Sequence, residues 1–596
     1  MINHFCKKPL WEVSRTLSDV AMGRQAPDLV IKDATLVNVC TKELLPHTDV
    51  AVAQGRIAMV GDCKGLIGPH TTVVDAKGKW LAPAFMDGHI HVESSMLTAG
   101  EYAKAVVPHG TSAIFMDPHE ICNVAGFDGV KCMLQDAKRT PLKAILSTPS
   151  CVPAVPGFED TGASVGPLDV AESMTWDECS GLGEMMNFPG IIYSDERTHA
   201  IVGETLKAGK IVTGHFSIPD TGSALNAYVA AGVRCCHESS RAEDALAKMR
   251  LGMYAMLRKG SAWNDLHEVS KAVTAHEVDS RFACLISDDT HPHTLAGKGH
   301  MDYIVRRAIE EGIDPLTAIQ MATINTAQCF QLDHEMGSIT PGKCADMVLL
   351  DDLNTCLVSK VWIDGDLVAE DGQIVGTYPA YTYPEWITHS VHLDPISSAE
   401  LKIAHEGASA KVRVIEAIPG RTGTVERFAT LPVVDGAIQA DSEQDVLKAF
   451  VLERHHETGT KGFGFLQGFG IRHGALAQTV AHDAHNLLVV GDNDEDMALA
   501  ANELIRLEGG LVAVKDGKVL AEVALPIAGL MSDRPLHEMN DKVAALEAAW
   551  QEMGCTLPSP FMIMSIIPLA CLPELRLTNR GLVDCRTFQF VEPILD

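Results

Sequence analysis

Several common sequence patterns are missing from this chain of 596 residues, and each absence narrows the possible functions. No GxGxxG turn and no P-loop motif is present, which argues against the doubly wound sheets that bind nucleotide phosphates. The sixteen cysteines include no CxxC pair and follow no regular framework. A disulfide scaffold or a zinc ribbon is therefore not expected.

Positive charge is also scarce. Lys and Arg number 48 against 78 Asp and Glu, which gives a formal net charge of −30. A nucleic-acid backbone or an anionic membrane surface needs a basic face, so neither is expected as a partner. A small neutral or cationic substrate fits this charge better. Hydrophobic residues make up 46 % of the chain and charged residues 21 %, which is the balance of a soluble globular enzyme rather than a disordered or fibrous chain.

No segment has the features of a secretion signal or a membrane span. The first residues, MINHFCKKPLWEV, contain no apolar signal core. The most apolar late stretch, Phe561–Leu572, is interrupted by Pro568 and is too short to cross a bilayer. We therefore expect a cytoplasmic protein with free thiols, in which Phe561–Leu572 is buried.

The pattern of short elements predicts four regions. Residues 1–26 are expected to form a helical lead-in. Short β segments in 27–80 return in 336–395, which predicts one discontinuous β-sandwich domain built from both flanks. Residues 396–596 are expected to form a C-terminal α/β domain.

The inserted region, 81–335, alternates apolar strands with amphipathic or Ala-rich helices. Eight such strands are typical of a (β/α)₈ barrel, whereas the rival doubly wound sheet normally has fewer strands and a Gly-rich turn. The strand candidates are Leu81–His91, Thr111–Glu120, Leu142–Ser150, Gly181–Met186, Lys210–Ser217, Gly232–Ser239, Met253–Ser261 and Phe282–Thr290.

Polar residues gather where these strands end, which is where barrel enzymes carry their chemistry. On a strand, residues i and i+2 point the same way, so His89 and His91 project together. A lone His-x-His pair is as easily two exposed strand residues, but further candidates recur at the ends of later strands. They are Asp117, His119, Glu120, Glu184, His215, His237, Asp288 and Asp289.

Four histidines and two carboxylates are too many ligands for one tetrahedral ion, and they suit a pair of divalent ions. We expect one ion at His89, His91 and Asp288 and the other at His215 and His237, with Glu184 as a bridge. Two cations lower the pKa of a shared water, and Asp288 beside that water is placed to take its proton.

This barrel pattern resembles the amidohydrolase superfamily. A bridging Glu184, the segments MDPHEI (116–121) and ISDDTHPH (286–293), and two C-terminal segments resemble the bacterial adenine deaminase family in particular. The C-terminal segments are GFGIRHGALAQTVAHDAHNLLVVG and PELRLTNRGLVDC. The resemblance extends from about residue 28 over nearly the whole chain.

The resemblance implies hydrolytic deamination of adenine to hypoxanthine and ammonia, by hydroxide attack at C6 with protonation of N1. It implies two Mn²⁺ or Fe²⁺ ions per site, although the ligand set would also accept Zn²⁺. It also implies a homo-oligomer, taken as a dimer. Glu120 is the candidate proton donor to N1, with His119 and Asp289 as rivals, and these three and Asp117 are the candidate substrate-binding residues.

Several alternatives stay open. A deacetylase or cyclic amidase of the same fold would need an Arg or Lys that grips phosphate, for which Arg241 is the nearest candidate. A barrel without catalysis would typically have lost metal ligands. The run Thr479–Asn486, with His482 and His485, is expected to have a structural or capping role rather than to form a second metal site or a wall of the active site.

Overall fold

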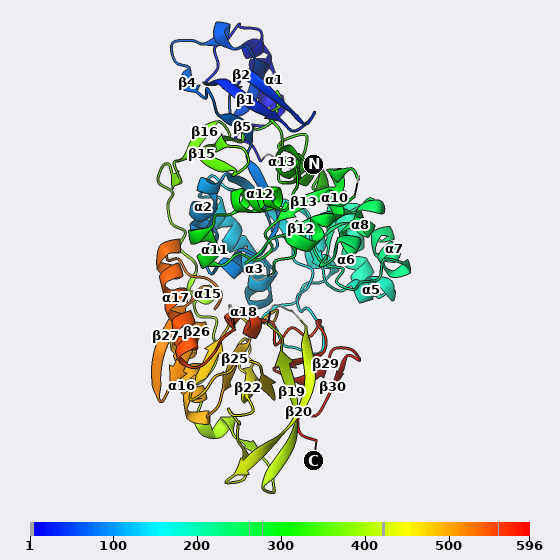
Figure 1. The fold of residues 1–596 in the computed structure, drawn as a ribbon, viewed down its shortest axis with the longest axis vertical. Coiled ribbons are helices and arrows are strands. Elements are labelled where there is room, and N and C mark those ends of the chain that lie inside the picture. Colours follow the sequence, from blue (N-terminus) through cyan, green and yellow to red (C-terminus); the bar gives the residue numbers. More distant parts are fainter. Residues whose placement is uncertain (1–4, 262, 277, 420–422, 558–559, 596) are drawn as a thin grey trace.

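The computed structural model describes residues 5–261, 263–276, 278–419, 423–557 and 560–595. Three bodies follow one another along the long axis of the molecule (Figure 1). A β-sheet domain lies at one end, the barrel lies in the middle, and the C-terminal domain lies at the other end. The barrel is therefore covered on two opposite sides.

The β-sheet domain takes strands from both flanks of the barrel. Its nine-stranded sheet joins five strands before the barrel to four strands after it, and β5 provides the junction by pairing with β1 and with β14. Helix α1 (Leu10–Ala21) packs Val13, Leu17 and Val20 against this sheet. The strands are β1 (Leu29–Asn38), β2 (Glu43–Ala53), β3 (Arg56–Gly61), β4 (Thr72–Asp75), β5 (Trp80–Pro83), β14 (Met347–Asp352), β15 (Leu357–Ile363), β16 (Asp366–Glu370) and β17 (Gln373–Ile374).

The first barrel strand is shorter than the sequence predicts. Leu81–Pro83 belongs to β5 of the flanking sheet, where Pro83 pairs with Met347. The chain then enters the barrel at Phe85, whose amide donates to the carbonyl of Gly110. One apolar run thus serves two sheets, and an apolar run alone does not show where one sheet ends and the next begins.

The predicted (β/α)₈ barrel is confirmed. Eight parallel strands form one sheet, and hydrogen bonds between the ends of the first and eighth strands close it: the amide of Asp288 donates to the carbonyl of His89, and that of His91 to the carbonyl of Asp288. The strands are β6 (Phe85–Ile90), β7 (Thr111–Met116), β8 (Lys143–Thr148), β9 (Cys179–Met185), β10 (Ile211–Gly214), β11 (Val233–Cys236), β12 (Tyr254–Arg258) and β13 (Ala283–Ile286).

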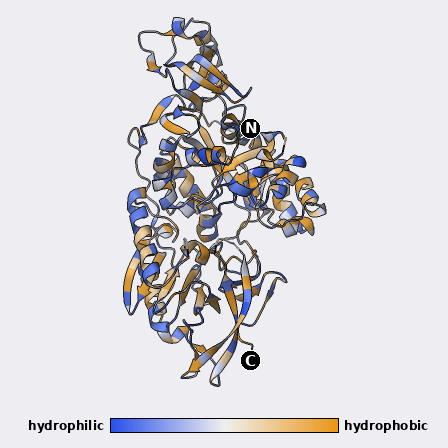
Figure 2. Cartoon of the chain, in the orientation of Figure 1, coloured by the Kyte–Doolittle hydropathy of each residue, from blue (hydrophilic) through white to orange (hydrophobic). Residues whose placement is uncertain are grey.

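Helices surround this barrel, and Figure 2 shows hydrophobic residues on the strands with more hydrophilic residues on the helices around them. Their amphipathic sequences bury one face against the strands. They are α2 (Ala99–Val106), α3 (His119–Ala137), α4 (Pro167–Ser173), α5 (Phe188–Ile192), α6 (Glu196–Lys207), α7 (Ser223–Ala230), α8 (Ala242–Arg250), α9 (Leu266–Val269), α10 (Lys271–Thr274), α11 (Pro292–Gly297), α12 (Met301–Glu310), α13 (Pro315–Met321) and α14 (Ile324–Cys329).

The C-terminal domain is built on a ten-stranded sheet with a three-stranded sheet beside it. Its strands are β18 (Ile403–Ala404), β19 (Ser409–Ala417), β20 (Thr424–Val434), β21 (Ala437–Ile438), β22 (Val446–Leu452), β23 (Lys461–Gln467), β24 (Ala475–Gln478), β25 (Leu487–Gly491), β26 (Gly510–Lys515), β27 (Lys518–Ala524), β28 (Leu575–Thr578), β29 (Gly581–Asp584) and β30 (Gln589–Phe590). Its helices, with α15 in the segment that leads to it, are α15 (Glu385–Thr388), α16 (Asp494–Arg506), α17 (Leu536–Glu552) and α18 (Pro560–Ser565).

Specific contacts hold the C-terminal domain on the barrel. Asp160, in the loop after β8, accepts hydrogen bonds from Asn579 and Arg580, and the hydroxyl of Thr578 donates to the carbonyl of Phe158. These contacts place the β24–β25 loop and α18 over the end of the barrel where its strands finish (Figure 1). The predicted burial of Phe561–Leu572 is confirmed for residues 561–570, whereas Cys571 and Leu572 are partly exposed.

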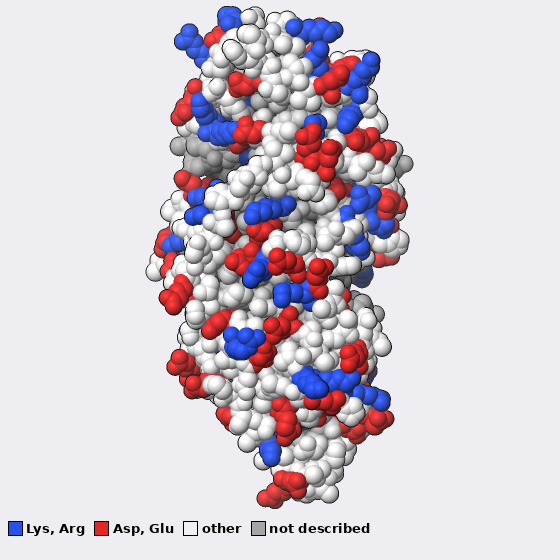
Figure 3. Space-filling view, turned by 90° about the vertical axis from the view of Figure 1, so that its left-hand side faces the viewer, with Lys and Arg blue, Asp and Glu red and all other residues white. Residues whose placement is uncertain are grey.

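The surface fits the composition. On the face drawn in Figure 3, acidic and basic side chains are interspersed. Within the described residues, no helix is long and apolar enough to cross a membrane. All sixteen cysteines are free.

Candidate active site

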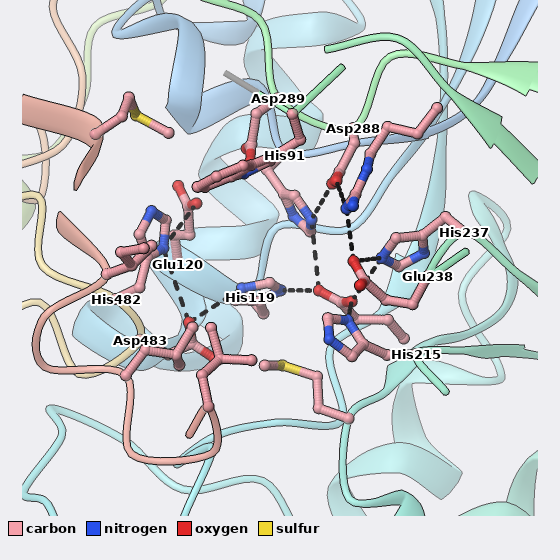
Figure 4. Close-up of a pocket in the computed structure, with 18 residues that line it drawn as sticks. His91, His119, Glu120, His215, His237, Glu238, Asp288, Asp289, His482 and Asp483 are labelled. Carbon is pink, nitrogen blue, oxygen red and sulfur yellow. Dashed lines mark hydrogen bonds and ion pairs between the residues drawn. The ribbon is translucent and has the colours of Figure 1, made fainter. Parts of the chain in front are cut away.

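Most of the strand-end residues predicted from the sequence line one cavity (Figure 4). Nε2 of His91 lies 3.3 Å from Oδ1 of Asp288, and Nε2 of His89 lies 3.5 Å from the same oxygen. Asp288 has a left-handed backbone with φ of 67°. Its hydrogen bonds to the first strand hold this sparsely populated conformation, which is a feature of functional sites.

Glu184, at the end of β9, lies at the centre of the cluster. Its Oε1 is 3.4 Å from Nε2 of His91, while its Oε2 is 3.2 Å from Nε2 of His237 and accepts a hydrogen bond from Nδ1 of His215. Burial opposes the charge on Glu184, but His215 and His237 outweigh it and hold the pKa of the carboxyl well below its ordinary value. The two oxygens of one carboxylate thus face two separate groups of histidines.

This donor set fits divalent metal ions. An ion bound at about 2.1 Å holds tetrahedral ligands roughly 3.4 Å apart, close to the separations around Glu184 and Asp288. Nδ1 of His91 donates to the carbonyl of Asp117 at 2.8 Å, so the tautomer leaves a lone pair on Nε2, which faces the two carboxylates. Nε2 of His89 is buried and has no hydrogen-bond partner within the described residues.

Arg258, at the end of β12, joins the cluster through Asp288. Its Nη1 lies 2.7 Å from Oδ2 of Asp288, and it also bonds Asp265 and Glu238. Burial raises the pKa of Asp288, but Arg258 and then His89 outweigh it and hold that pKa well below its ordinary value. Asp288 is therefore kept as a carboxylate in a buried site.

Glu120 and His119 begin helix α3 and line the same cavity. Glu120 is 1 % exposed, and within the described residues neither carboxylate oxygen has a hydrogen-bond partner. Burial, followed by the nearby charge of Glu93, raises the pKa of Glu120 well above its ordinary value. Burial, followed by Asp288, raises the pKa of Asp289 to about 6. Both groups are suited to carry a proton.

Asp117 supports the cluster from behind and does not line the cavity. It is fully buried, and its Oδ2 accepts a 2.7 Å hydrogen bond from the amide of Glu184. A Cβ on Gly183 would lie 2.4 Å from that carboxylate, so the GLGE sequence of β9 makes room for Asp117. This position favours a role in orienting Glu184 and His91 over the substrate contact expected for Asp117.

The expectation that Thr479–Asn486 has a structural or capping role is wrong for His482, because this side chain lines the cavity together with its neighbour Asp483. Nδ1 of His482 is 3.4 Å from Oε1 of Glu120, and Oδ1 of Asp483 is 3.7 Å from Nε2 of His119. His485 is buried behind them and accepts a hydrogen bond from the amide of Ala481. Docking of the C-terminal domain onto the barrel brings this loop to the site.

Sequence reasoning missed two cavity residues that carry charge, namely Arg258 and Glu238. Glu238 directly follows His237 and Arg258 ends the seventh strand, so their positions at strand ends were an available signal. Asp483 belongs to the run Thr479–Asn486, for which a place in the wall of the active site was considered but a structural role was favoured. Arg241, the phosphate-gripping candidate, instead pairs with Asp244 on the surface.

Comparison with known proteins gives matches over the whole chain. Residues 80–368 match the amidohydrolase family, and residues 421–589 match the adenine deaminase C-terminal domain. An adenine deaminase from Clostridium botulinum (strain 657 / Type Ba4) is 65 % identical over 598 residues, which cover 100 % of both chains. Adenine deaminases from Moorella thermoacetica and Rhizobium meliloti are 53 % and 44 % identical, each over 99 % of this chain and at least 99 % of their own length.

Proposed function

The chain belongs to the adenine deaminase family, and from this premise we propose that it hydrolyses adenine to hypoxanthine and ammonia. One observation from the site carries the hydrolytic part of the proposal. Glu184 presents one carboxylate oxygen to His91 and the other to His215 and His237. This is the arrangement expected of a carboxylate that bridges two cations.

The amidohydrolase family implies a divalent metal, and the cluster supplies suitable ligands. We propose two ions, manganese or iron, with zinc as an acceptable substitute. His89, His91 and Asp288 would hold one, His215 and His237 would hold the other, and Glu184 would hold both. Bound there, two such ions lower the pKa of a water enough to make a hydroxide near neutral pH.

Asp288 is the proposed base for the attacking water. The water adds its oxygen to C6 of the ring and gives up a proton, and Asp288 is a buried carboxylate that Arg258 keeps ionised. The same residue is then placed to deliver a proton to the amino group, which leaves as ammonia. Arg258 stabilises the charged form of Asp288 before the attack and again after the proton has been delivered.

Glu120 is the proposed donor to N1 of the purine. Carbon C6 is a poor electrophile while the ring remains aromatic, so addition needs a proton at N1. Glu120 faces the cavity and is buried, and burial raises its pKa well above the ordinary value, which favours its protonated form. His119 and Asp289 line the same cavity and remain the rival donors.

The test is the release of ammonia from adenine by purified protein, measured with and without added Mn²⁺ and with hypoxanthine identified by chromatography. We expect a metal-dependent rate and one hypoxanthine per ammonia. If both metal sites are full but no ammonia is released from adenine, the proposed substrate is wrong, whereas the proposed metal site is retained.

A deacetylase of the same fold has less support. The cavity does contain Arg258, but its guanidinium nitrogens are bonded to Asp265, Glu238 and Asp288, which leaves it poorly suited to grip a phosphate. Release of acetate rather than ammonia from candidate substrates would favour that reaction.

We also propose a cytoplasmic location and a homodimer. The sixteen free cysteines support a reducing compartment. The dimer rests on the family resemblance, and light scattering coupled to size exclusion tests it directly: a mass near 64.1 kDa would indicate a monomer instead.

A further inference from the structure

The cavity has two unlike walls. The barrel side carries the histidines and carboxylates described above. The C-terminal domain supplies the opposite side, which is largely apolar apart from His482 and Asp483. The apolar residues of this second wall are Met562, Ile566, Leu569 and Leu572, and Met186 at the end of β9 adjoins them.

The loop that carries His482 is held rigidly. The amide of His482 donates to the carbonyl of Ser565, at the end of α18, with a distance of 2.8 Å. Beneath the loop lies the fully buried guanidinium of Arg454, which bonds the carbonyls of His485, Ser390 and Ala528. A loop with its backbone bonded in this way presents His482 in one position.

The loop also contacts the barrel residues that face the substrate. His482 lies 3.4 Å from Glu120, and Asp483 lies 3.7 Å from His119 (Figure 4). Within the described residues neither carboxylate oxygen of Glu120 has a hydrogen-bond partner, and the imidazole of His482, 3.4 Å from Oε1, is a contact from the C-terminal domain that restricts where the carboxyl points.

The apolar wall matches a flat heteroaromatic ring. Small-molecule sites combine apolar surface, which holds the body of a ligand, with a few polar groups that orient it. Here α18 and the residues after it provide the surface, and the two sides of the cavity provide polar groups at its edge. A purine has this combination of apolar faces and a polar edge.

We propose that the C-terminal domain forms the purine-recognition half of the active site. Met562 and Ile566 form the surface on which the ring lies, and His482 acts as a positioning residue that holds Glu120 against the edge of the ring. This inference rests on the proposed function and assigns part of the substrate specificity to residues outside the barrel.

Steady-state kinetics on the metal-loaded, full-length enzyme tests the apolar wall. We expect Met562→Ala and Ile566→Ala each to raise the KM for adenine and the inhibition constant of hypoxanthine about tenfold, with kcat changed less than threefold. Lost apolar contacts in a pocket typically change binding by ten- to two-hundred-fold. Met497→Ala is the matched control, because Met497 is equally buried but packs in the separate apolar cluster beneath α16.

Variants of His482 test the positioning role. His482→Ala should lower kcat for adenine about a hundredfold at unchanged metal content, and His482→Gln, which keeps a side-chain donor, should recover at least tenfold of that loss. A purely structural role predicts equal losses in the two variants, accompanied by a fall in Tm.

Three outcomes would overturn the inference. The first is a Met497→Ala variant whose KM rises as much as that of Met562→Ala. The second is unchanged kinetics in the Met562, Ile566 and His482 variants of an active enzyme, which would leave the proposed function intact. The third is a wild-type enzyme that neither turns over adenine nor binds it by calorimetry, which would overturn the proposed function as well.

Discussion

Replacement of Asp288 by asparagine tests the proton-transfer step most directly. The amide keeps the shape of the side chain but removes the charge that Arg258 stabilises at 2.7 Å and the basic oxygen that faces His89 and His91. A positioned acid–base group typically contributes 10²–10⁴ in rate, or about 3–5 kcal/mol of activation free energy. We therefore expect Asp288→Asn to lose two to four orders of magnitude in kcat.

The loss of stability should be much smaller than the loss of rate. Arg258 keeps its bonds to Asp265 and Glu238 in the variant, so we expect a cost of about 1.5–3 kcal/mol, the usual value for a hydrogen bond to a charged group. Asp265→Asn is the matched control, because it removes a carboxylate from the same guanidinium without touching the histidines. Its kcat should fall less than tenfold.

Ammonia release, metal content and thermal unfolding should be measured on the same preparations of both variants. The reasoning is refuted if Asp288→Asn retains more than a tenth of wild-type kcat with its metal bound. It is also refuted if Asp265→Asn loses as much activity as Asp288→Asn, because the shared contact with Arg258 would then explain both effects.

Three further predictions concern other buried carboxylates. Glu184→Gln should lose bound metal and activity together, since the neutral amide cannot bridge two cations; metal analysis showing two ions per chain with full activity would contradict this. Asp117→Ala should weaken metal binding 10–100-fold, as is typical when a group that orients a ligand is removed, because its carboxylate holds the amide of Glu184 at 2.7 Å; an unchanged metal titration would count against it. Glu159 is 4 % exposed, and burial raises its pKa to about 8. The folded state therefore favours the neutral form of this carboxyl. Its stabilising contribution is complete below the pKa of an unfolded glutamate, about 4.3, and is lost as pH rises through 8. Relative to Glu159→Gln, the wild-type Tm should therefore fall between pH 5 and pH 8 and stay level above that; parallel Tm curves for the two proteins would refute the assignment.

The barrel and the core of its site were predictable because both depend on local periodicity. Alternation along a strand places His89 and His91 on one side, and the ends of parallel barrel strands converge on one face. Residues hundreds of positions apart, such as His89 and Asp288, were therefore expected to meet, and their ring and carboxylate atoms lie 3.5 Å apart.

The part that each residue plays within the cluster was less predictable. Asp117 and Asp289 both follow strand ends, yet Asp117 lies behind Glu184 whereas Asp289 lines the cavity. Position at a strand end predicts which residues lie near one another. The direction in which each side chain points depends on backbone angles beyond the strand. The left-handed backbone of Asp288 is an example, because nothing in its local sequence required it.

The C-terminal wall of the cavity was beyond sequence reasoning. The apolar run Phe561–Leu572 was expected to be buried, and most of it is. That expectation did not indicate that side chains of this run line the cavity. His482 is buried through contacts with Glu120 of the barrel. Such a contact depends on how two domains dock, and no periodicity within either domain encodes it.

Local sequence patterns specify the eight barrel strands, the helices between them, and the histidines and carboxylates at the strand ends. Local hydrogen-bond geometry and side-chain alternation are enough to specify these. Such patterns do not show which polar residues face the cavity, that Arg258 bonds Asp288, or that His482 reaches Glu120 from another domain. Packing between distant segments sets these contacts, and a displacement of a few ångströms decides whether a residue can bind a ligand in the site.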